Sequence, residues 1–141
     1  MLPDFATYCR LIANLPEQFP FIRSSTLIVY TIGPFAAEVE GLLTFADGYT
    51  LDVWELLDFN KHAIRSYSYA VDRLGERVWW YDSQSHPNDP TLASTDPHHK
   101  HVHPDIKHNR IPAPDISFNQ PNLPFLIREI EQQIGLPLAA S

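Results

Sequence analysis

The sequence has a single cysteine, Cys9, among its 141 residues. One cysteine excludes an internal disulfide and any zinc site that is built on cysteine pairs. The N-terminal segment has no basic region followed by an apolar stretch, so no secretory signal is indicated. No apolar run approaches the length that a membrane-spanning helix needs. These absences predict a soluble protein of a reducing, cytoplasmic compartment.

Glycine is also scarce, with five residues, and the motifs that depend on it are missing. There is no glycine-rich phosphate loop and no Gly-x-Ser-x-Gly nucleophile elbow, and the His-Glu-x-x-His pattern of many metalloproteases is absent as well. A kinase, a serine hydrolase and a zinc protease of that type are therefore not expected. No cofactor is indicated.

Charged residues make up only 19% of the chain, and the net charge is −7. This acidic balance argues against a protein that coats nucleic acid or an anionic membrane with its whole surface. Hydrophobic residues reach 44%, which is typical of a folded globular protein. At this length they predict one domain over residues 1–141.

Short apolar runs separated by turn residues predict an antiparallel β-meander. The dipeptide Asp47-Gly48 separates two such runs in the manner of a hairpin turn. About five strands are expected, roughly at residues 22–33, 36–46, 49–59, 63–72 and 76–82. Helical spacing of apolar residues predicts an N-terminal helix at 3–14 and a C-terminal helix at 122–135 that packs on the sheet. The predicted fold class is therefore α+β.

Proline and histidine are concentrated in residues 83–121, where no periodicity is visible. Residues 86–124 hold six of the seven histidines and eight of the thirteen prolines: His86, His98, His99, His101, His103, His108, Pro87, Pro90, Pro97, Pro104, Pro112, Pro114, Pro121 and Pro124. A loop of this length inside one domain is unusual, and proline restricts the unfolded chain. We therefore expect an ordered, irregular flap that lies on the sheet.

The hairpin turn also makes a prediction about two carboxylates. If Asp47 and Gly48 are its two central residues, Glu40 lies directly opposite Glu55 on a largely apolar face. Such a pair repels, and burial raises the pKa of one member. A shared proton, a metal ion or a basic neighbour would compensate the repulsion, whereas an exposed strand end would leave both carboxylates solvated. Both interpretations stay open at this point.

The segment from His98 to His101, which reads His-His-Lys-His, is the sharpest local feature. Imidazoles exchange protons near neutral pH and also bind metals. In an extended chain His99 and His101 point to one side, and His98 and Lys100 point to the other. The alternatives are an acid–base or phosphate site, a metal site that uses His99, His101 and Glu55, and a structural cluster. Lys100 favours an anion over a metal ion.

The fourth and fifth predicted strands supply further candidate site residues. Tyr67 lies in the middle of the fourth predicted strand, and Tyr81-Asp82 ends the fifth, four residues before His86. Catalytic groups often lie where a loop leaves a rigid scaffold, which directs attention to Asp82 and His86. Aromatic side chains are ordinary on half-buried strands, so Tyr67 and Tyr81 have a structural interpretation as well.

Several of these blocks together resemble the TumE family, over roughly residues 24–134. The blocks are Asp47-Gly48, Leu51 to Glu55, Tyr67-Ser-Tyr69, Tyr81-Asp82-Ser-Gln-Ser-His86 and Pro97-His-His-Lys-His101. The resemblance implies the toxin of a prokaryotic type II toxin–antitoxin pair. The expected partner is a cognate antitoxin protein, and RNA is an expected substrate. The matching positions are Glu55, Tyr81, Asp82, His86, His98, His99, Lys100 and His101.

The leading hypothesis is a metal-independent endoribonuclease toxin. In this hypothesis His86 shares the acid and base roles with His99 or His101, Lys100 stabilises the transition-state charge, and Glu55 orients a histidine or acts as base. The supporting positions are Glu40, Tyr67, Tyr81, Asp82 and His98. The alternative is a non-catalytic protein-binding module whose histidine cluster is structural or binds a metal. The sequence indicates no oligomeric state.

Overall fold

The computed structural model describes residues 1–84, 88–95 and 97–136. Its elements in chain order are α1 (Phe5–Gln18), β1 (Ile22–Ser25), β2 (Ile28–Thr31), β3 (Ala36–Phe45), η1 (Ala46–Gly48), β4 (Tyr49–Asp58), β5 (Ala63–Arg73), β6 (Glu76–Asp82), η2 (Pro90–Thr95), β7 (His99–His101), β8 (Arg110–Pro112) and α2 (Leu123–Gln133). The predicted α+β class is confirmed. Over the described ranges the sheet has eight strands instead of about five.

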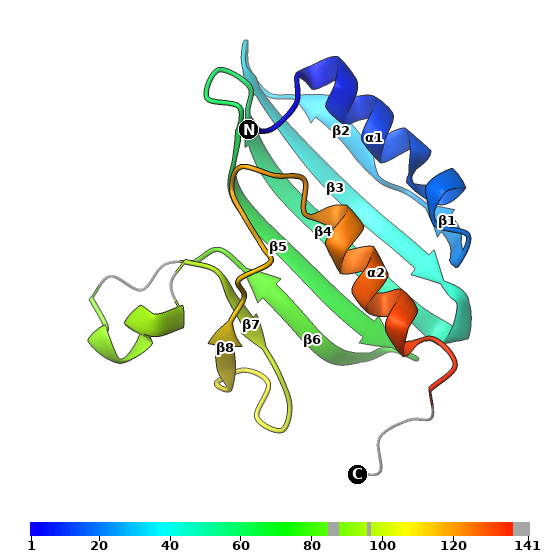
Figure 1. Cartoon of the computed structure of the whole chain (residues 1–141), viewed down its shortest axis with the longest axis vertical. Helices are drawn as coiled ribbons and strands as arrows, with labels where there is room; N and C mark the ends of the chain where they lie inside the picture. The colour runs from blue at the N-terminus through cyan, green and yellow to red at the C-terminus, as the bar shows by residue number, and fades with distance from the viewer. Residues whose placement is uncertain (85–87, 96, 137–141) are drawn as a thin grey trace.

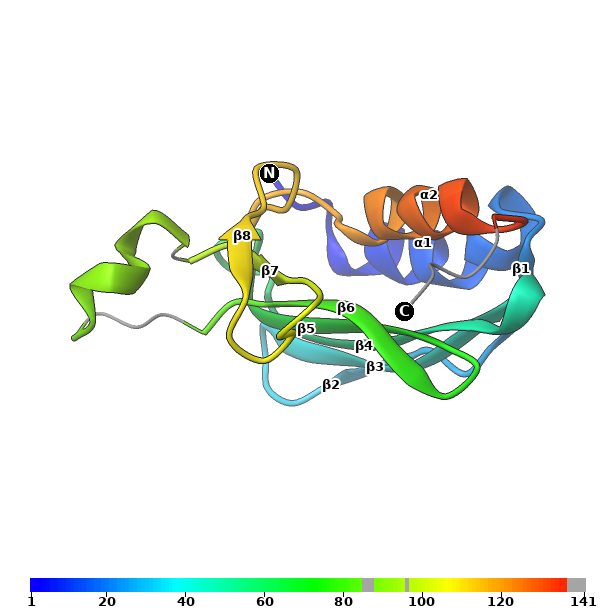
Figure 2. The same cartoon turned by 90° about the horizontal axis from the view of Figure 1, so that it is seen from below.

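The two helices cover the same face of the sheet, as Figure 2 shows. Asp4 caps α1, because its side chain accepts a hydrogen bond from the Thr7 amide at 2.9 Å. The helix was expected to end before Pro16, but it continues to Gln18. Burial of Leu15 and Phe19 on the sheet favours the extra turn, and the Phe19 amide donates to the Leu15 carbonyl at 2.9 Å. The hydrophobic core lies between this face and the helices.

The strands pair antiparallel, and β3 to β6 form the predicted meander (Figure 1). The single strand expected at 22–33 is two short strands, β1 and β2, and both pair with β3. The expected flap at 83–121 contributes β7 and β8, which extend the sheet beyond β6 in the order β6-β7-β8. This part of the flap therefore extends the sheet at its edge.

The break between β1 and β2 has a steric cause at Gly41. The backbone of Thr26 crosses over this glycine so closely that a Cβ there would lie 2.6 Å from the Thr26 carbonyl oxygen. Gly41 also has a φ of +141°, which side chains disfavour. The Thr26 side chain accepts a hydrogen bond from the Leu42 amide at 2.8 Å, which fixes the crossing beside the glycine.

The predicted register of the β3–β4 hairpin is wrong by one residue. Val39 lies opposite Glu55, and Glu40 lies opposite Trp54. The cause is a connection of three residues, Ala46–Gly48, where the sequence suggested two. Because successive side chains of a strand alternate between faces, the shift turns Glu40 to the opposite face from Glu55. Glu40 is exposed to solvent, whereas Glu55 is fully buried under the helices.

Candidate active site

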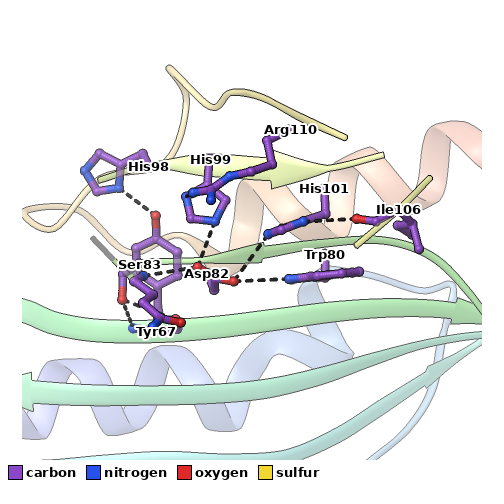
Figure 3. A network of polar contacts seen from close by, with 10 residues as sticks. Tyr67, Trp80, Asp82, Ser83, His98, His99, His101, Ile106 and Arg110 are labelled. Carbon is purple, nitrogen blue, oxygen red and sulfur yellow. Dashed lines mark hydrogen bonds and ion pairs between the residues drawn. The ribbon is translucent and has the colours of Figure 1, made fainter. Parts of the chain in front are cut away.

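A row of polar side chains forms where β7 pairs with β6. The pairing places His99 directly opposite Asp82 and His101 directly opposite Trp80. Opposed residues of an antiparallel pair point to the same face, so both imidazoles lie beside the carboxylate and the indole. The sequence His-Lys-His thus brings two histidines to one side of β7 because its side chains alternate. Figure 3 shows this cluster.

The Asp82 carboxylate is the centre of the cluster. Its Oδ1 lies 2.8 Å from His99 Nε2, and its Oδ2 lies 3.5 Å from His101 Nε2. The Trp80 indole donates to Oδ2 at 3.2 Å, and the Gln84 amide donates to Oδ1 at 3.1 Å. Burial raises the pKa of Asp82, but the close contact and charge interaction with His99 and the hydrogen bonds from Trp80 and Gln84 outweigh it and lower the pKa below its ordinary value. Asp82 is therefore an anion near neutral pH.

His99 is fully buried, and its contacts fix which nitrogen carries the proton. Arg110 Nη2 lies 3.0 Å from His99 Nδ1. A guanidinium group can only donate, so Nδ1 must accept and carries no hydrogen. The single proton of the neutral ring is then on Nε2, which faces Asp82. His99 thereby connects the arginine to the carboxylate.

His101 has the opposite arrangement. Its Nδ1 lies 3.0 Å from the Ile106 carbonyl oxygen, which can only accept, so Nδ1 carries a hydrogen. In the neutral ring Nε2 has a lone pair, and it lies 3.5 Å from Asp82 Oδ2, a longer separation than the 2.8 Å of His99. Burial lowers the pKa of His101, while the Asp82 charge acts in the opposite direction. The ring therefore has a basic nitrogen available near neutral pH and an anion beside it that stabilises the cation formed on protonation.

Aromatic packing holds His98 and His101, the two histidines on either side of His99 in the sequence. The His101 ring stacks on Trp80 with centroids 3.9 Å apart. The Tyr67 hydroxyl lies 2.6 Å from His98 Nδ1, and the two rings are parallel within 6°. Burial lowers the pKa of His98. These contacts fix the positions of both rings.

A groove lies beside Asp82 on the sheet face that carries Trp54. Small polar side chains and two aromatic residues line it: Trp54, Ser66, Tyr67, Ser68, Asp82, Ser83 and Gln84. The register explains the row, because Trp54 lies opposite Ser68 and Ser68 lies opposite Asp82. The carboxylate thus has an open approach from one side, in agreement with its side-chain exposure of 25%.

Lys100 and Tyr81 lie on the other face of the same strand pair. Lys100 Nζ lies 3.0 Å from Glu129 Oε2 on α2, and the Tyr81 hydroxyl donates to Glu129 at 2.9 Å. Lys100 also lies 4.8 Å from the ring centroid of Trp79. The expected alternation of His99, Lys100 and His101 is confirmed. Its consequence is that Lys100 is paired with a carboxylate and points away from the two imidazoles.

Glu55 belongs to a separate, buried network. Its carboxylate accepts hydrogen bonds from the hydroxyls of Tyr8 on α1 and Tyr69 on β5, the latter at 2.5 Å. Asn122, at the start of α2, donates to the Tyr69 hydroxyl at 3.1 Å. Burial raises the pKa of Glu55 and outweighs the hydrogen bonds. The structure therefore places Glu55 between the sheet and both helices, and places Asp82 on the opposite sheet face.

The cluster has the composition of a metal site, with two histidines and one carboxylate. Ligand atoms of Asp82, His99 and His101 lie within 4.8 Å of one another, and Glu55 is not among them. His101 suits a metal, since its Nδ1–H donates to a carbonyl and leaves Nε2 free. His99 does not suit one, because Arg110 occupies the position where a metal-bound ring needs an acceptor for its other N–H. The donor set thus fits a metal only in part.

Sequence reasoning identified several of these residues and missed others. Asp82, His98, His99 and His101 were named, and the structure brings them together. His86 lies outside the described residues. Arg110 was not predicted, because no pattern connects it with His99, which is eleven positions away. Trp80 was not predicted either, although it contacts both Asp82 and His101.

One of three comparisons with known proteins gives a match. The family model described as Toxin TumE matches residues 10–134, so the chain belongs to the TumE toxin family. A search of curated proteins and a search of solved structures found no significant match. Among the helices of the described residues, none is long and apolar enough to cross a membrane.

Proposed function

We propose that this chain is the toxin of a type II toxin–antitoxin pair and that it cleaves RNA without a metal ion. The family match supports the toxin role and a protein antitoxin as partner. The observation that carries the cleavage proposal is the Asp82 carboxylate between two imidazoles, one of which presents a basic nitrogen. The cytoplasm is the compartment in which RNA and such a partner meet.

The chemistry that suits these groups is transfer of a phosphate ester to the neighbouring ribose hydroxyl. The 2′ oxygen forms a bond to phosphorus, the bond from phosphorus to the 5′ oxygen breaks, and the products are a 2′,3′-cyclic phosphate and a 5′ hydroxyl. One proton leaves the 2′ hydroxyl and one joins the 5′ oxygen. Neither water nor a metal ion is consumed, so two protein groups of suitable pKa are sufficient.

We assign the first proton transfer to His101. Its Nε2 accepts the proton of the 2′ hydroxyl, and Asp82 stabilises the imidazolium that forms. His99 contributes through Asp82, which it contacts at 2.8 Å. His86 is the residue that we expect to supply the second proton. Glu55 and Lys100 contribute to folding in this proposal, because both are engaged by other partners.

The charge distribution is compatible with a phosphate-containing substrate at this end of the sheet. From His98 to Arg110 the chain has the cations Lys100, Lys107 and Arg110 against the single anion Asp105. The net charge of −7 therefore belongs to other parts of the chain. A locally basic hairpin provides attraction over about a Debye length, roughly 8–10 Å.

The test compares the wild type with two histidine variants. The chain is expressed in bacteria with and without the product of the adjacent gene, and the purified protein is incubated with RNA in EDTA. We expect growth arrest that the adjacent product relieves, and RNA fragmentation that EDTA leaves unchanged. His101→Ala loses both effects, whereas His108→Ala, an exposed imidazole 3.2 Å from Asp105, retains both. Equal cleavage by wild type and His101→Ala would contradict the proposal.

A non-catalytic protein-binding role is the second candidate, and the sheet edge favours it. Among the described strands β2 pairs with β3 alone, so its other side is an edge of the sheet, which can pair with a strand of another protein. Ile28 and Ile32 at this edge are 55% and 51% exposed. This role would be favoured over catalysis if His101→Ala still arrests growth and still binds the partner, and if neither the wild type nor this variant cleaves RNA.

A further inference from the structure

Arg110 is the one cation in direct contact with an imidazole of the cluster in the described residues. Strand β8 places it there, because Arg110 pairs with His101 in the β7–β8 ladder and its side chain reaches His99. We propose that Arg110 is a positioning residue that fixes the proton of His99 on Nε2 and thereby excludes divalent metals from a site that would otherwise bind them. The inference concerns the site of the proposed function but requires no RNA cleavage.

The order of donors and acceptors determines the His99 tautomer. Arg110 donates at 3.0 Å to His99 Nδ1, and His99 Nε2–H faces Asp82 Oδ1 at 2.8 Å. Reversal of the imidazole tautomer would place an N–H against the guanidinium and a lone pair against the carboxylate. Each of these contacts would be repulsive, and His99 is fully buried, so water cannot relieve them.

The His99 tautomer has a consequence for metal binding. A neutral histidine that binds a metal through Nε2 needs its hydrogen on Nδ1 and an acceptor for that hydrogen. His101 meets this condition with the Ile106 carbonyl. His99 meets it only if Arg110 moves away. Without the guanidinium, the two imidazoles and Asp82 form the set of two histidines and one carboxylate that suits Zn²⁺, Co²⁺ or Fe²⁺.

The same tautomer has a consequence for proton transfer. Since His99 engages Oδ1 of Asp82, only Oδ2 remains for His101. A single mobile proton can then lie between His101 and the carboxylate. A bound metal would occupy the same nitrogen and the same oxygen, and would remove the base. Arg110 thus favours acid–base chemistry over metal binding at the cluster of Asp82, His99 and His101.

The experiment compares Arg110→Met, which keeps an unbranched apolar side chain, with two controls. Arg110→Lys retains a donor, and Lys107→Met removes an exposed positive charge from the same hairpin. The probe is Co²⁺ alone, titrated by absorbance and calorimetry. We expect Arg110→Met to bind Co²⁺ about 10–100-fold more tightly than the wild type, the range of effects seen for groups behind metal ligands. Both controls should bind as weakly as the wild type.

The imidazole tautomers give a second measurement that needs only the wild type. Nitrogen-15 NMR should show the His99 hydrogen on Nε2 and the His101 hydrogen on Nδ1. A hydrogen on His99 Nδ1, or Co²⁺ binding by the wild type as tight as that of a folded Arg110→Met, would overturn the inference. If Arg110→Met does not fold, the wild-type tautomers alone decide. Absence of RNA cleavage together with the expected tautomers would overturn the proposed function and leave this inference standing.

Discussion

Replacement of Asp82 with Asn slows RNA cleavage by about 10²–10⁴-fold, the usual range for loss of acid–base assistance. The carboxylate is the group that both imidazoles face, at 2.8 Å from His99 and 3.5 Å from His101. An amide has nearly the same shape but no charge, so it cannot stabilise the imidazolium that forms on His101. The measurement is kcat/KM for a short RNA, with the folded fraction of the variant checked by its unfolding curve.

The pH profile of the same variant gives an independent readout. The Asp82 charge raises the pKa of His101 against the effect of burial. Its removal therefore lowers that pKa, and the acidic limb of the residual activity moves to lower pH. The matched control is Asp105→Asn, because Asp105 also lies beside a histidine but is exposed and outside the cluster. Equal losses in the two variants would contradict a special role for Asp82.

Replacement of Glu55 with Leu lowers the free energy of unfolding by about 2–6 kcal/mol, since it leaves two buried hydroxyls without an acceptor at roughly 1–3 kcal/mol each. The hydroxyls are those of Tyr8 and Tyr69, and both tyrosines are fully buried. The control is Glu40→Leu on the neighbouring strand. Glu40 is exposed, so this variant should remain within about 0.5 kcal/mol of the wild type. Urea denaturation measures both.

The pH dependence of stability reports the protonation of Glu55. Burial raises the pKa of this carboxyl above its ordinary value of 4.5. Between 4.5 and the raised pKa, the folded chain keeps a proton that the unfolded chain releases, so stability falls as pH rises through this window. Below pH 4.5 the contribution is fully present. The wild type should therefore lose stability relative to Glu55→Gln as pH rises from 4.5, and the opposite trend would show that Glu55 is ionised in the fold.

The sequence was sufficient for features that depend on local pattern. Alternation along a strand predicted that His99 and His101 share a side and that Lys100 does not, and the pairing of β7 with β6 confirms it. Turn residues and apolar runs likewise predicted the meander of β3 to β6. These features follow from the alternation of side chains along a strand, which is visible in the sequence of one chain.

Features that depend on one residue of strand register or on tertiary contacts could not be predicted from the sequence. A connection of three residues in place of two moved Glu40 away from Glu55. Strands β7 and β8 have three residues each, too few to show a period, so the sheet extension was missed. Glu129 and Arg110, which determine the partners of Lys100 and His99, come from distant segments that no local pattern connects.

The ends of the RNA fragments test metal-independent cleavage most directly. Purified protein is incubated with a labelled RNA in excess EDTA, and the products are analysed by mass spectrometry. Acid–base catalysis by His101 and Asp82 predicts cleavage at the full rate, with 2′,3′-cyclic phosphate and 5′ hydroxyl ends. Fragments that form only after a divalent metal is restored, and that have 3′ hydroxyl and 5′ phosphate ends, would contradict it.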